Sequence, residues 1–136
     1  MEDIIVFAQQ QFVIIIALTA VIFLLIRHEG SKGGEKLSCL QVVGAVNKDD
    51  AVIVDVRETK EFDDGHIVNA IHIPHAKIAD SVKVLEKHRQ KKIIVVDKMG
   101  QHSAAVVKTL EANEFTVARL SGGITEWKQD NLPLVK

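Results

Sequence analysis

The feature that most constrains this chain is an uninterrupted apolar run close to its N-terminus. Residues 12–26 read FVIIIALTAVIFLLI, fifteen side chains of which only Thr19 is polar. In a helix these residues rise about 22 Å, which is less than the roughly 30 Å hydrocarbon core of a bilayer. Including residues 4–8 lengthens the helix to residues 4–26 and about 35 Å, with the polar triplet Gln9-Gln10-Gln11 inside it. We therefore expect a membrane-spanning helix whose residues 4–26 contact the lipid bilayer.

Two alternatives to a permanent membrane anchor fit the sequence less well. The core helix of a soluble protein is rarely apolar on every face over four turns. A cleaved signal peptide begins with a basic segment and ends in a small-residue cleavage site, whereas this chain begins Met1-Glu2-Asp3 and has no such site after the run. We interpret residues 1–27 as one uncleaved anchor. Basic residues follow the span but do not precede it, so the positive-inside rule predicts an external N-terminus and a cytoplasmic C-terminal part. These basic residues are Arg27, Lys32 and Lys36.

The rest of the chain is expected to form one domain after a short linker. Residues 28–36 contain three glycines and several charges, which is typical of a flexible juxtamembrane linker, and residues 37–136 form the domain. A hydrophobic content of 47% excludes a disordered chain. The net charge of -1, from 17 basic and 18 acidic residues, gives no electrostatic basis for binding nucleic acid. The single cysteine, Cys39, excludes an internal disulfide and a cysteine-rich zinc site.

Apolar patterns in residues 37–136 alternate between those of strands and those of helices. Strands are predicted at residues 51–56 and 92–96, with a weaker one at 70–73 and another at 116–120. Helices are predicted at residues 38–46, 81–88, 103–113 and 124–129. In the first of these helices we expect Leu40, Val43 and Val46 to face the core. This alternation predicts a three-layer α/β fold with a central, mostly parallel sheet, whose functional sites lie at the carboxyl ends of the strands.

A cluster of charged residues follows the first strong strand. It consists of Asp55, Arg57, Glu58, Glu61, Asp63, Asp64 and His66, with Gly65 among them. Carboxylates beside a histidine can hold a metal ion, but the spacing matches no dedicated metal loop and Arg57 lies among the acids. We expect instead an ion-pair and hydrogen-bond cluster that shapes a turn, with a positive φ angle at Gly65. His72, His75 and His88 are expected on the solvated surface, and we predict no metal ion and no cofactor.

The residues after the second strong strand offer a different kind of site. Residues 97–102 join that strand to the start of a predicted helix. Successive backbone N–H groups in such a loop, together with the helix dipole, form a cradle for an anion. The first position of the loop, which Asp97 occupies, is where that field would activate a nucleophile.

Two separated motifs resemble the signatures of rhodanese-like domains. The first comprises Asp55, Val56, Arg57, Glu58, Glu61, Phe62, Gly65, His66, Ile67, Ala70, Ile73 and Pro74. The second comprises Gly122, Gly123, Ile124, Trp127, Leu132 and Pro133. The resemblance covers residues 37–136 and implies a three-layer rhodanese-like domain in which these motif residues, Trp127 in the core among them, are structural. The N-terminal anchor and the NLPLVK ending resemble the YibN-type proteins of bacteria, which implies an anchor in the inner membrane.

The predicted loop departs from the pattern of active rhodaneses, where it reads C-x-x-G-x-R-S and the cysteine carries a sulfane sulfur as a persulfide. Here the loop is Asp97, Lys98, Met99, Gly100, Gln101, His102 and Ser103. It keeps the glycine and the serine, but Asp97 stands at the nucleophile position and His102 at the arginine position. A carboxylate cannot carry a persulfide, and it repels a thiosulfate charge by about 4 kcal/mol at 4 Å and an effective dielectric constant of 20. We therefore predict no catalytic residue, and we expect Asp97 to fill the cradle by accepting its N–H groups.

Three routes to activity stay open from the sequence. Cys39 is an alternative nucleophile, although a free cysteine is often a small buried hydrophobe. Asp97 is an alternative phosphoryl acceptor, which needs further carboxylates to hold Mg²⁺, and Asp55 is its one plausible helper. A sulfurtransferase with another non-standard nucleophile is the third.

We interpret the chain as a catalytically inactive, membrane-anchored module that binds or regulates another protein at the cytoplasmic face. The expected partner is a membrane or cytoplasmic protein rather than a nucleic acid. The amides of Gln9, Gln10 and Gln11 offer polar contacts to another membrane helix.

Overall fold

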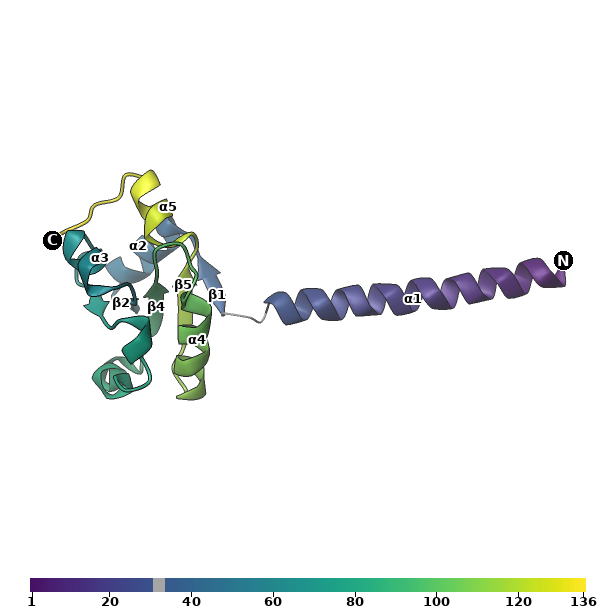
Figure 1. The fold of residues 1–136 in the computed structure, drawn as a ribbon, viewed down its shortest axis with the longest axis horizontal. Coiled ribbons are helices and arrows are strands. Elements are labelled where there is room, and N and C mark those ends of the chain that lie inside the picture. Colours follow the sequence, from purple (N-terminus) through teal and green to yellow (C-terminus); the bar gives the residue numbers. More distant parts are fainter. Residues whose placement is uncertain (31–33) are drawn as a thin grey trace. The chain divides into compact units, whose positions relative to one another are not determined.

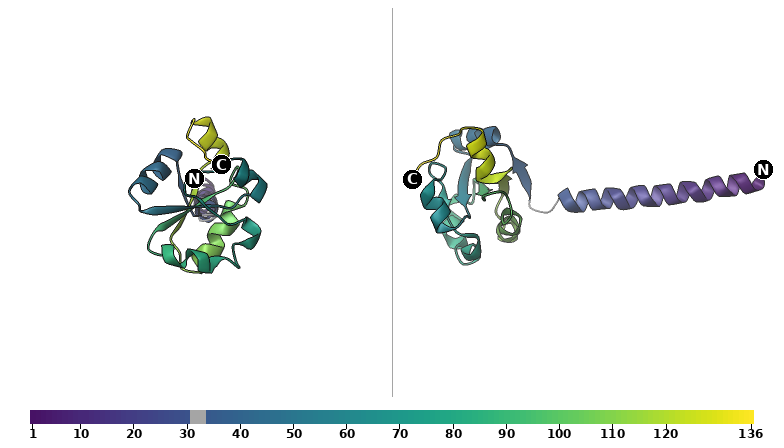
Figure 2. Two further views of the ribbon diagram at one scale, coloured as in Figure 1. Left: turned by 90° about the vertical axis from the view of Figure 1, so that its left-hand side faces the viewer. Right: turned by 45° about the horizontal axis from the view of Figure 1, so that its top comes forward.

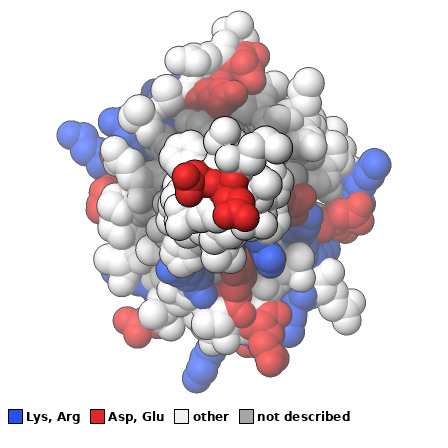
Figure 3. Space-filling model, turned by 90° about the vertical axis from the view of Figure 1, so that its right-hand side faces the viewer, with Lys and Arg blue, Asp and Glu red and all other residues white. Residues whose placement is uncertain are grey.

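The structure, a computed structural model, describes residues 1–30 and 34–136. These residues fall into two compact units, a helix within Met1–Lys32 and a folded domain within Gly33–Lys136 (Figure 1). Residues 31–33 of the predicted linker lie outside the described residues. On the part of the folded domain that Figure 3 shows, Lys and Arg side chains are interspersed with Asp and Glu.

Helix α1 spans Glu2–Gly30 without interruption, and the polar triplet does not break it. Its 29 residues rise about 43 Å, which exceeds the hydrocarbon thickness of a bilayer. Within the helix the one polar side chain of the apolar run is satisfied, because Thr19 Oγ1 donates to the Ile15 carbonyl at 2.8 Å. The apolar side chains are all exposed. As the sequence predicts, α1 is long and apolar enough to cross a membrane, although it ends at Gly30 rather than at residue 27.

The described domain contains one five-stranded sheet in which every pairing is parallel. The strands are β1 (Glu35–Leu37), β2 (Ala51–Asp55), β3 (Ile71–His72), β4 (Lys92–Val96) and β5 (Val117–Leu120). Their order is β1-β5-β4-β2-β3. The central strands β2 and β4 are the two apolar runs picked out from the sequence, and β-branched residues buried on both faces suit that position. The predicted α/β fold with a parallel sheet is confirmed.

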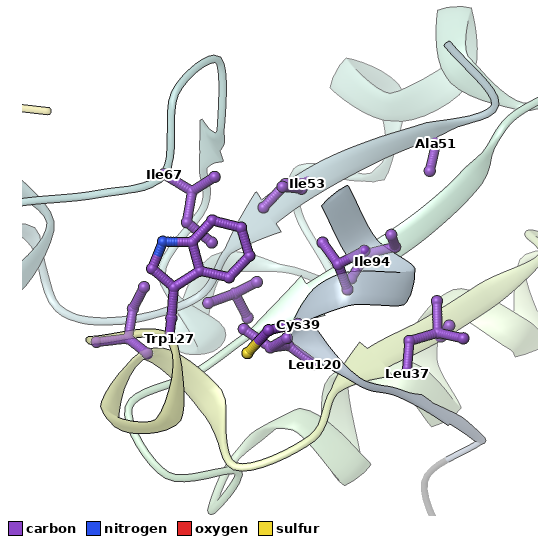
Figure 4. Packing of buried hydrophobic residues seen from close by; sticks show 12 residues of the cluster. Leu37, Cys39, Ala51, Ile53, Ile67, Ile94, Leu120 and Trp127 are labelled. Atoms are coloured by element: carbon purple, nitrogen blue, oxygen red, sulfur yellow. The ribbon is translucent and has the colours of Figure 1, made fainter. Parts of the chain in front are cut away.

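Helices cover both faces of this sheet, which gives three layers (Figure 2). They are α2 (Cys39–Asn47), α3 (Thr59–Asp64), α4 (Ser103–Ala112), α5 (Gly123–Gln129) and two 3₁₀ helices, η1 (His75–Lys77) and η2 (Val82–His88). α2 and α5 pack on one face with a core that includes Cys39, Ile94 and Trp127 (Figure 4). α4 and η2 pack on the other face with a core that includes Leu85, Val95 and Leu110.

Two segments differ from the elements predicted for them. Glu35 and Lys36, which the sequence assigns to the linker 28–36, pair with β5 as part of β1. No local sequence pattern predicts β1, because its partner strand β5 lies far along the chain. Thr59–Asp64, expected as a turn, forms the short helix α3.

Helix α2 buries a different face from the one predicted. Leu40 is 79% exposed, whereas Cys39 and Val42 are buried, and Val43 and Val46 pack partly against them. Positions 39, 42, 43 and 46 follow the i, i+3, i+4, i+7 spacing of an amphipathic helix, and the small thiol of Cys39 takes the place that we gave to Leu40. The capping box between Ser38 and Gln41 fixes where this helix begins.

The corrected orientation of α2 gives a direct test. We expect Val42→Ala to lower the free energy of unfolding by about 2 kcal/mol, because it removes buried methyl groups and leaves a cavity. Leu40→Ala should change it by less than about 0.5 kcal/mol, since that side chain is exposed. Urea unfolding of the full chain in detergent, followed by the fluorescence of its one tryptophan, measures both. A loss from Leu40→Ala as large as that from Val42→Ala would contradict this orientation of α2.

Candidate functional site

The carboxyl ends of β2 and β4 bring the two charged segments together. Asp55 is the last residue of β2 and lies opposite Val96, the last residue of β4. Asp97 follows directly, so both carboxylates lie at the same edge of the sheet, where functional sites of parallel sheets occur. Both are almost fully buried.

Asp55 is held by Arg57, its neighbour two residues on. The Arg57 Nε lies 3.0 Å from each carboxylate oxygen of Asp55, and Nη2 lies 2.7 Å from Oδ2. The same Nη2 donates to the Gly65 carbonyl at 2.8 Å, and Gly65 has the positive φ angle predicted for it, 155°. This buried ion pair therefore ties the end of β2 to the turn after α3. The predicted ion-pair cluster is confirmed for Asp55, Arg57 and Gly65.

Aromatic stacking completes this cluster. The Phe62 ring stacks on His66 at 3.8 Å and on His72 at 4.3 Å between ring centroids. His66 also exchanges two backbone hydrogen bonds with Val135, each 2.8 Å. The carboxylates of Glu61, Asp63 and Asp64 on α3 do not join this cluster of rings and ion pairs. The exposed side chain of Glu58 forms no cap at the start of that helix.

The loop after β4 holds the carboxylate of Asp97. Oδ1 accepts the N–H of Lys98 at 2.7 Å, and Oδ2 accepts the N–H of His102 at 2.5 Å. Asp97 is 4% exposed, and α4 begins directly after His102. The side chain thus lies where the sequence places an anion cradle, and it accepts backbone amides there as expected. These amides are occupied by the chain's own negative charge.

The N-terminus of α5 holds the other side of the same loop. Ile124 N donates to the Asp97 carbonyl at 2.8 Å, and both the N–H and the hydroxyl of Thr125 donate to the Lys98 carbonyl, at 3.1 and 3.0 Å. Gly123 permits this approach. A Cβ atom there would lie 2.3 Å from the Asp97 carbonyl oxygen, and its φ angle is +61°.

The histidines differ from the sequence-based prediction, because His72, His75 and His88 are half-buried rather than fully solvated. His75 stacks face to face on His102, with 3.9 Å between ring centroids, beside the Asp97 loop. Burial lowers the pKa of His88, and the positive charges of Lys87 and Lys91 act in the same direction. The stacking of His72 on Phe62 and of His75 on His102 depends on the fold and could not be predicted from the sequence.

Cys39 is poorly suited to replace the missing nucleophile. It is the first residue of α2, and its side chain is buried in the core on that face of the sheet, near Leu120 and Trp127 (Figure 4). Burial, and after it a hydrogen bond with Asp130, raise the pKa of its thiol to about 11. The thiol therefore stays protonated at neutral pH, while nucleophilic attack requires the thiolate.

Phosphoryl chemistry at Asp97 finds no support in the arrangement. The Asp55 carboxylate, its proposed helper, is engaged by Arg57. Within residues 1–30 and 34–136, no group of three or more His, Cys, Asp or Glu side chains is placed to hold a metal ion.

With the fold and the loop described, comparison with known proteins identifies the family. The rhodanese-like domain family matches residues 40–130, from the first turn of α2 to the end of α5. This chain belongs to the rhodanese-like domain family.

Its relatives include bacterial proteins and an archaeal protein of solved structure. It is 40% identical over 93 residues to the uncharacterized protein YibN of Escherichia coli K12, a match that covers 67% of this chain and 65% of YibN. It is 30% identical to the uncharacterized protein BU052 of Buchnera aphidicola, over 99% of this chain and 97% of that protein. The crystal structure of a rhodanese-related protein from Thermoplasma volcanium superposes with a TM-score of 0.68 and 30% identity, covering 74% of this chain and 97% of that one.

The family signatures of this rhodanese-like protein act on the loop from both sides. The first signature provides Asp55, Arg57 and Gly65, which fasten the neighbouring strand end. The second provides Gly122 and Gly123, which bring α5 onto the loop carbonyls, and Trp127, which is buried and donates to the Pro133 carbonyl at 3.1 Å. Sequence reasoning missed the part played by Thr125, for which the adjacent pair of glycines was the available signal.

The close contact at Gly123 predicts a large difference between two glycine substitutions. Gly123→Ala should lower the free energy of unfolding by about 3 kcal/mol, because the new Cβ collides with backbone oxygens and the φ angle is left-handed. Gly44→Ala is the matched control. Nothing lies within 4 Å of a Cβ there, and alanine in the α2 helix should stabilise by about 0.5–1 kcal/mol. Urea unfolding measures both, and similar effects at the two positions would contradict the geometry.

Proposed function

We propose that this chain is a membrane-anchored, catalytically inactive rhodanese-like protein that binds a protein partner at the cytoplasmic face of the inner membrane. The observation that carries the inactive role is the Asp97 carboxylate, which accepts the loop amides at the position of the family nucleophile. An oxygen acid cannot form a persulfide, and its charge opposes the approach of a second anion. The opposite hypothesis is a sulfurtransferase that uses another nucleophile.

The membrane part of the proposal rests on α1 and on the charges that flank it. The helix has Glu2 and Asp3 in its first turn and Arg27 and His28 in its last. Lys32 and Lys36 follow, and no Lys or Arg precedes the span. By the positive-inside rule this distribution favours an external N-terminus and a cytoplasmic domain.

A sulfur-transfer assay on the full chain in detergent separates the two hypotheses. With thiosulfate and cyanide we expect only background turnover, unchanged by Cys39→Ser, and no protein adduct with the added mass of one sulfur atom. The double variant Asp97→Cys with His102→Arg should gain the adduct, because it restores a thiol in a cradle of N–H groups. Wild-type turnover that disappears in Cys39→Ser or Asp97→Ala would instead establish the sulfurtransferase.

A surface that supports partner binding lies along the outer edge of β2. Pairing with β3 begins only at Val54 opposite Ile71, so residues 51–53 have no neighbouring strand on that side within the described domain. The chain before β3 turns away at Asn69, whose φ angle is 63°. A cavity of about 310 Å³ remains between this turn and the strand edge, bordered by Val68, Asn69 and Lys87.

The partner that fits this cavity, which we call the β2-edge groove, is an extended segment of another protein. Such a segment can add as a strand to the backbone groups that β3 leaves unpaired. Lys87 forms no ion pair with any residue in the described ranges, so an acidic side chain on the partner would complement it. Val68 offers an apolar contact, because it is 45% exposed.

Site-specific photo-crosslinking in intact membranes tests the groove. A photoreactive residue in place of Val68 should capture one defined partner, and Lys87→Glu should reduce the yield severalfold by reversing the charge at the rim. The matched control is the same substitution at Val84, which is 50% exposed and lies outside the groove. Equal capture from both positions, or a yield that Lys87→Glu leaves unchanged, would contradict this assignment.

A further inference from the structure

The register between β1 and β5 places two cations directly opposite each other. Lys36 pairs with Arg119, one residue from the end of each strand. Side chains directly opposite on neighbouring strands point to the same side of the sheet, and like charges in such pairs are destabilising. Neither side chain forms an ion pair with any carboxylate in residues 1–30 or 34–136. The domain therefore keeps two positive charges together without a counter-charge of its own.

One of the two cations also carries an unsatisfied buried donor. Arg119 is half-buried on β5, and its Nε is fully covered yet has no hydrogen-bond partner among the described residues. The other arginines of the domain behave differently, because Arg57 pairs with Asp55 and Arg89 pairs with Glu86. A buried N–H without an acceptor costs free energy, so the described chain leaves the Arg119 guanidinium short of acceptors.

A small cavity lies at these two side chains. Its volume is about 100 Å³, and its lining includes Lys36, Ser103, Arg119 and Ser121 together with the loop residues Met99 and Gly100. The hydroxyl of Ser103 donates to the Gly100 carbonyl at 3.0 Å. Ser121 has no side-chain hydrogen bond in the described part of the chain and is a free donor. Asp97 does not line this cavity, which shares Met99, Gly100 and Ser103 with the loop.

We propose that this cavity binds a phosphate group. Its volume is well below the roughly 300–1,000 Å³ of pockets for drug-sized ligands, but it accommodates one tetrahedral oxyanion. The guanidinium of Arg119 matches two phosphate oxygens in its fork geometry, and the ammonium of Lys36 neutralises the remaining charge. A bound dianion would also turn the repulsion across β1 and β5 into attraction. The site does not depend on the proposed function, since it uses none of the groups that make the Asp97 loop inactive.

Two sources can supply this phosphate group. Lys36 lies six residues along the chain from Gly30, the last residue of α1, and a phospholipid headgroup is one source. A free phosphate ester or inorganic phosphate is the other. The shared chemistry is the phosphate group, and the lipid environment of the experiment distinguishes the sources.

The test follows thermal unfolding of the full chain in maltoside micelles, which contain no phosphate, with Trp127 fluorescence as the signal. Inorganic phosphate should raise the unfolding midpoint of the wild type in a saturable manner, because it binds the folded state. Lys36→Gln and Arg119→Gln should lose this saturable shift. Lys108→Gln, which removes an exposed lysine of α4 outside the cavity, should keep it. A general salt effect of phosphate would move all these proteins equally.

A second measurement compares the unfolding temperatures of the wild type and Lys36→Gln without any ligand, because Lys36 is exposed and its substitution leaves the core intact. In the absence of phosphate, Lys36→Gln should unfold at a higher temperature than the wild type, since it removes the like charge opposite Arg119. If the lysine stem only packs against its neighbours, Lys36→Gln should instead lower the unfolding temperature.

Vesicles of phosphatidylglycerol then identify the source. If the headgroup occupies the cavity, the wild-type midpoint is already raised relative to Lys36→Gln and added phosphate shifts it no further. If free phosphate is the ligand, the saturable shift persists in these vesicles. An identical phosphate response of the wild type and Lys36→Gln in micelles and in vesicles overturns the proposal.

Discussion

The organisation of the domain depends on how the six-residue loop after β4 divides its backbone hydrogen bonds. Its amides at Lys98 and His102 donate inward to the Asp97 carboxylate, and its carbonyls at Asp97 and Lys98 accept from the first turn of α5. The inward hydrogen bonds use the loop's N–H groups, and those from α5 use its carbonyl groups. Together they hold the loop from two directions. In an active rhodanese the inward-pointing amides surround the reactive cysteine, whereas here they donate to the carboxylate of Asp97.

The two signature segments thus support the loop and supply none of the reacting groups. Asp55 and Arg57 fasten the end of β2 to Gly65, and the two glycines at the start of α5 admit backbone contact closer than any side chain allows. These supports are intact although Asp97 stands at the position of the family nucleophile. A domain that keeps these structural contacts but has an aspartate in place of the family's cysteine is consistent with a role in binding. For such a role the shape of the loop and of the surrounding surface is sufficient.

The sequence predicted the elements whose pattern is local and continuous. The runs of β2 and β4 and the amphipathic α4 follow directly from their periodicity, and the position of Asp97 follows from the strand that precedes it. The sequence did not predict β1, because three residues acquire a strand conformation only by pairing with β5. It misassigned Leu40 because hydrophobicity alone does not tell which apolar residue faces the core when a cysteine competes for the place. The stacking of His75 on His102, the β2-edge groove and the opposed cations all depend on register and tertiary packing, which no single segment encodes.

The end of the chain carries a consequence for how the two signature segments communicate. Pro133 accepts from the indole of Trp127, and Val135 bonds the backbone of His66 on both sides. The last few residues therefore act as a strap that links the first signature to the second across the surface. A proteolytic cut or a bulky fusion at this strap would loosen both signatures together, and with them the Asp97 loop between, without touching any residue of the loop itself.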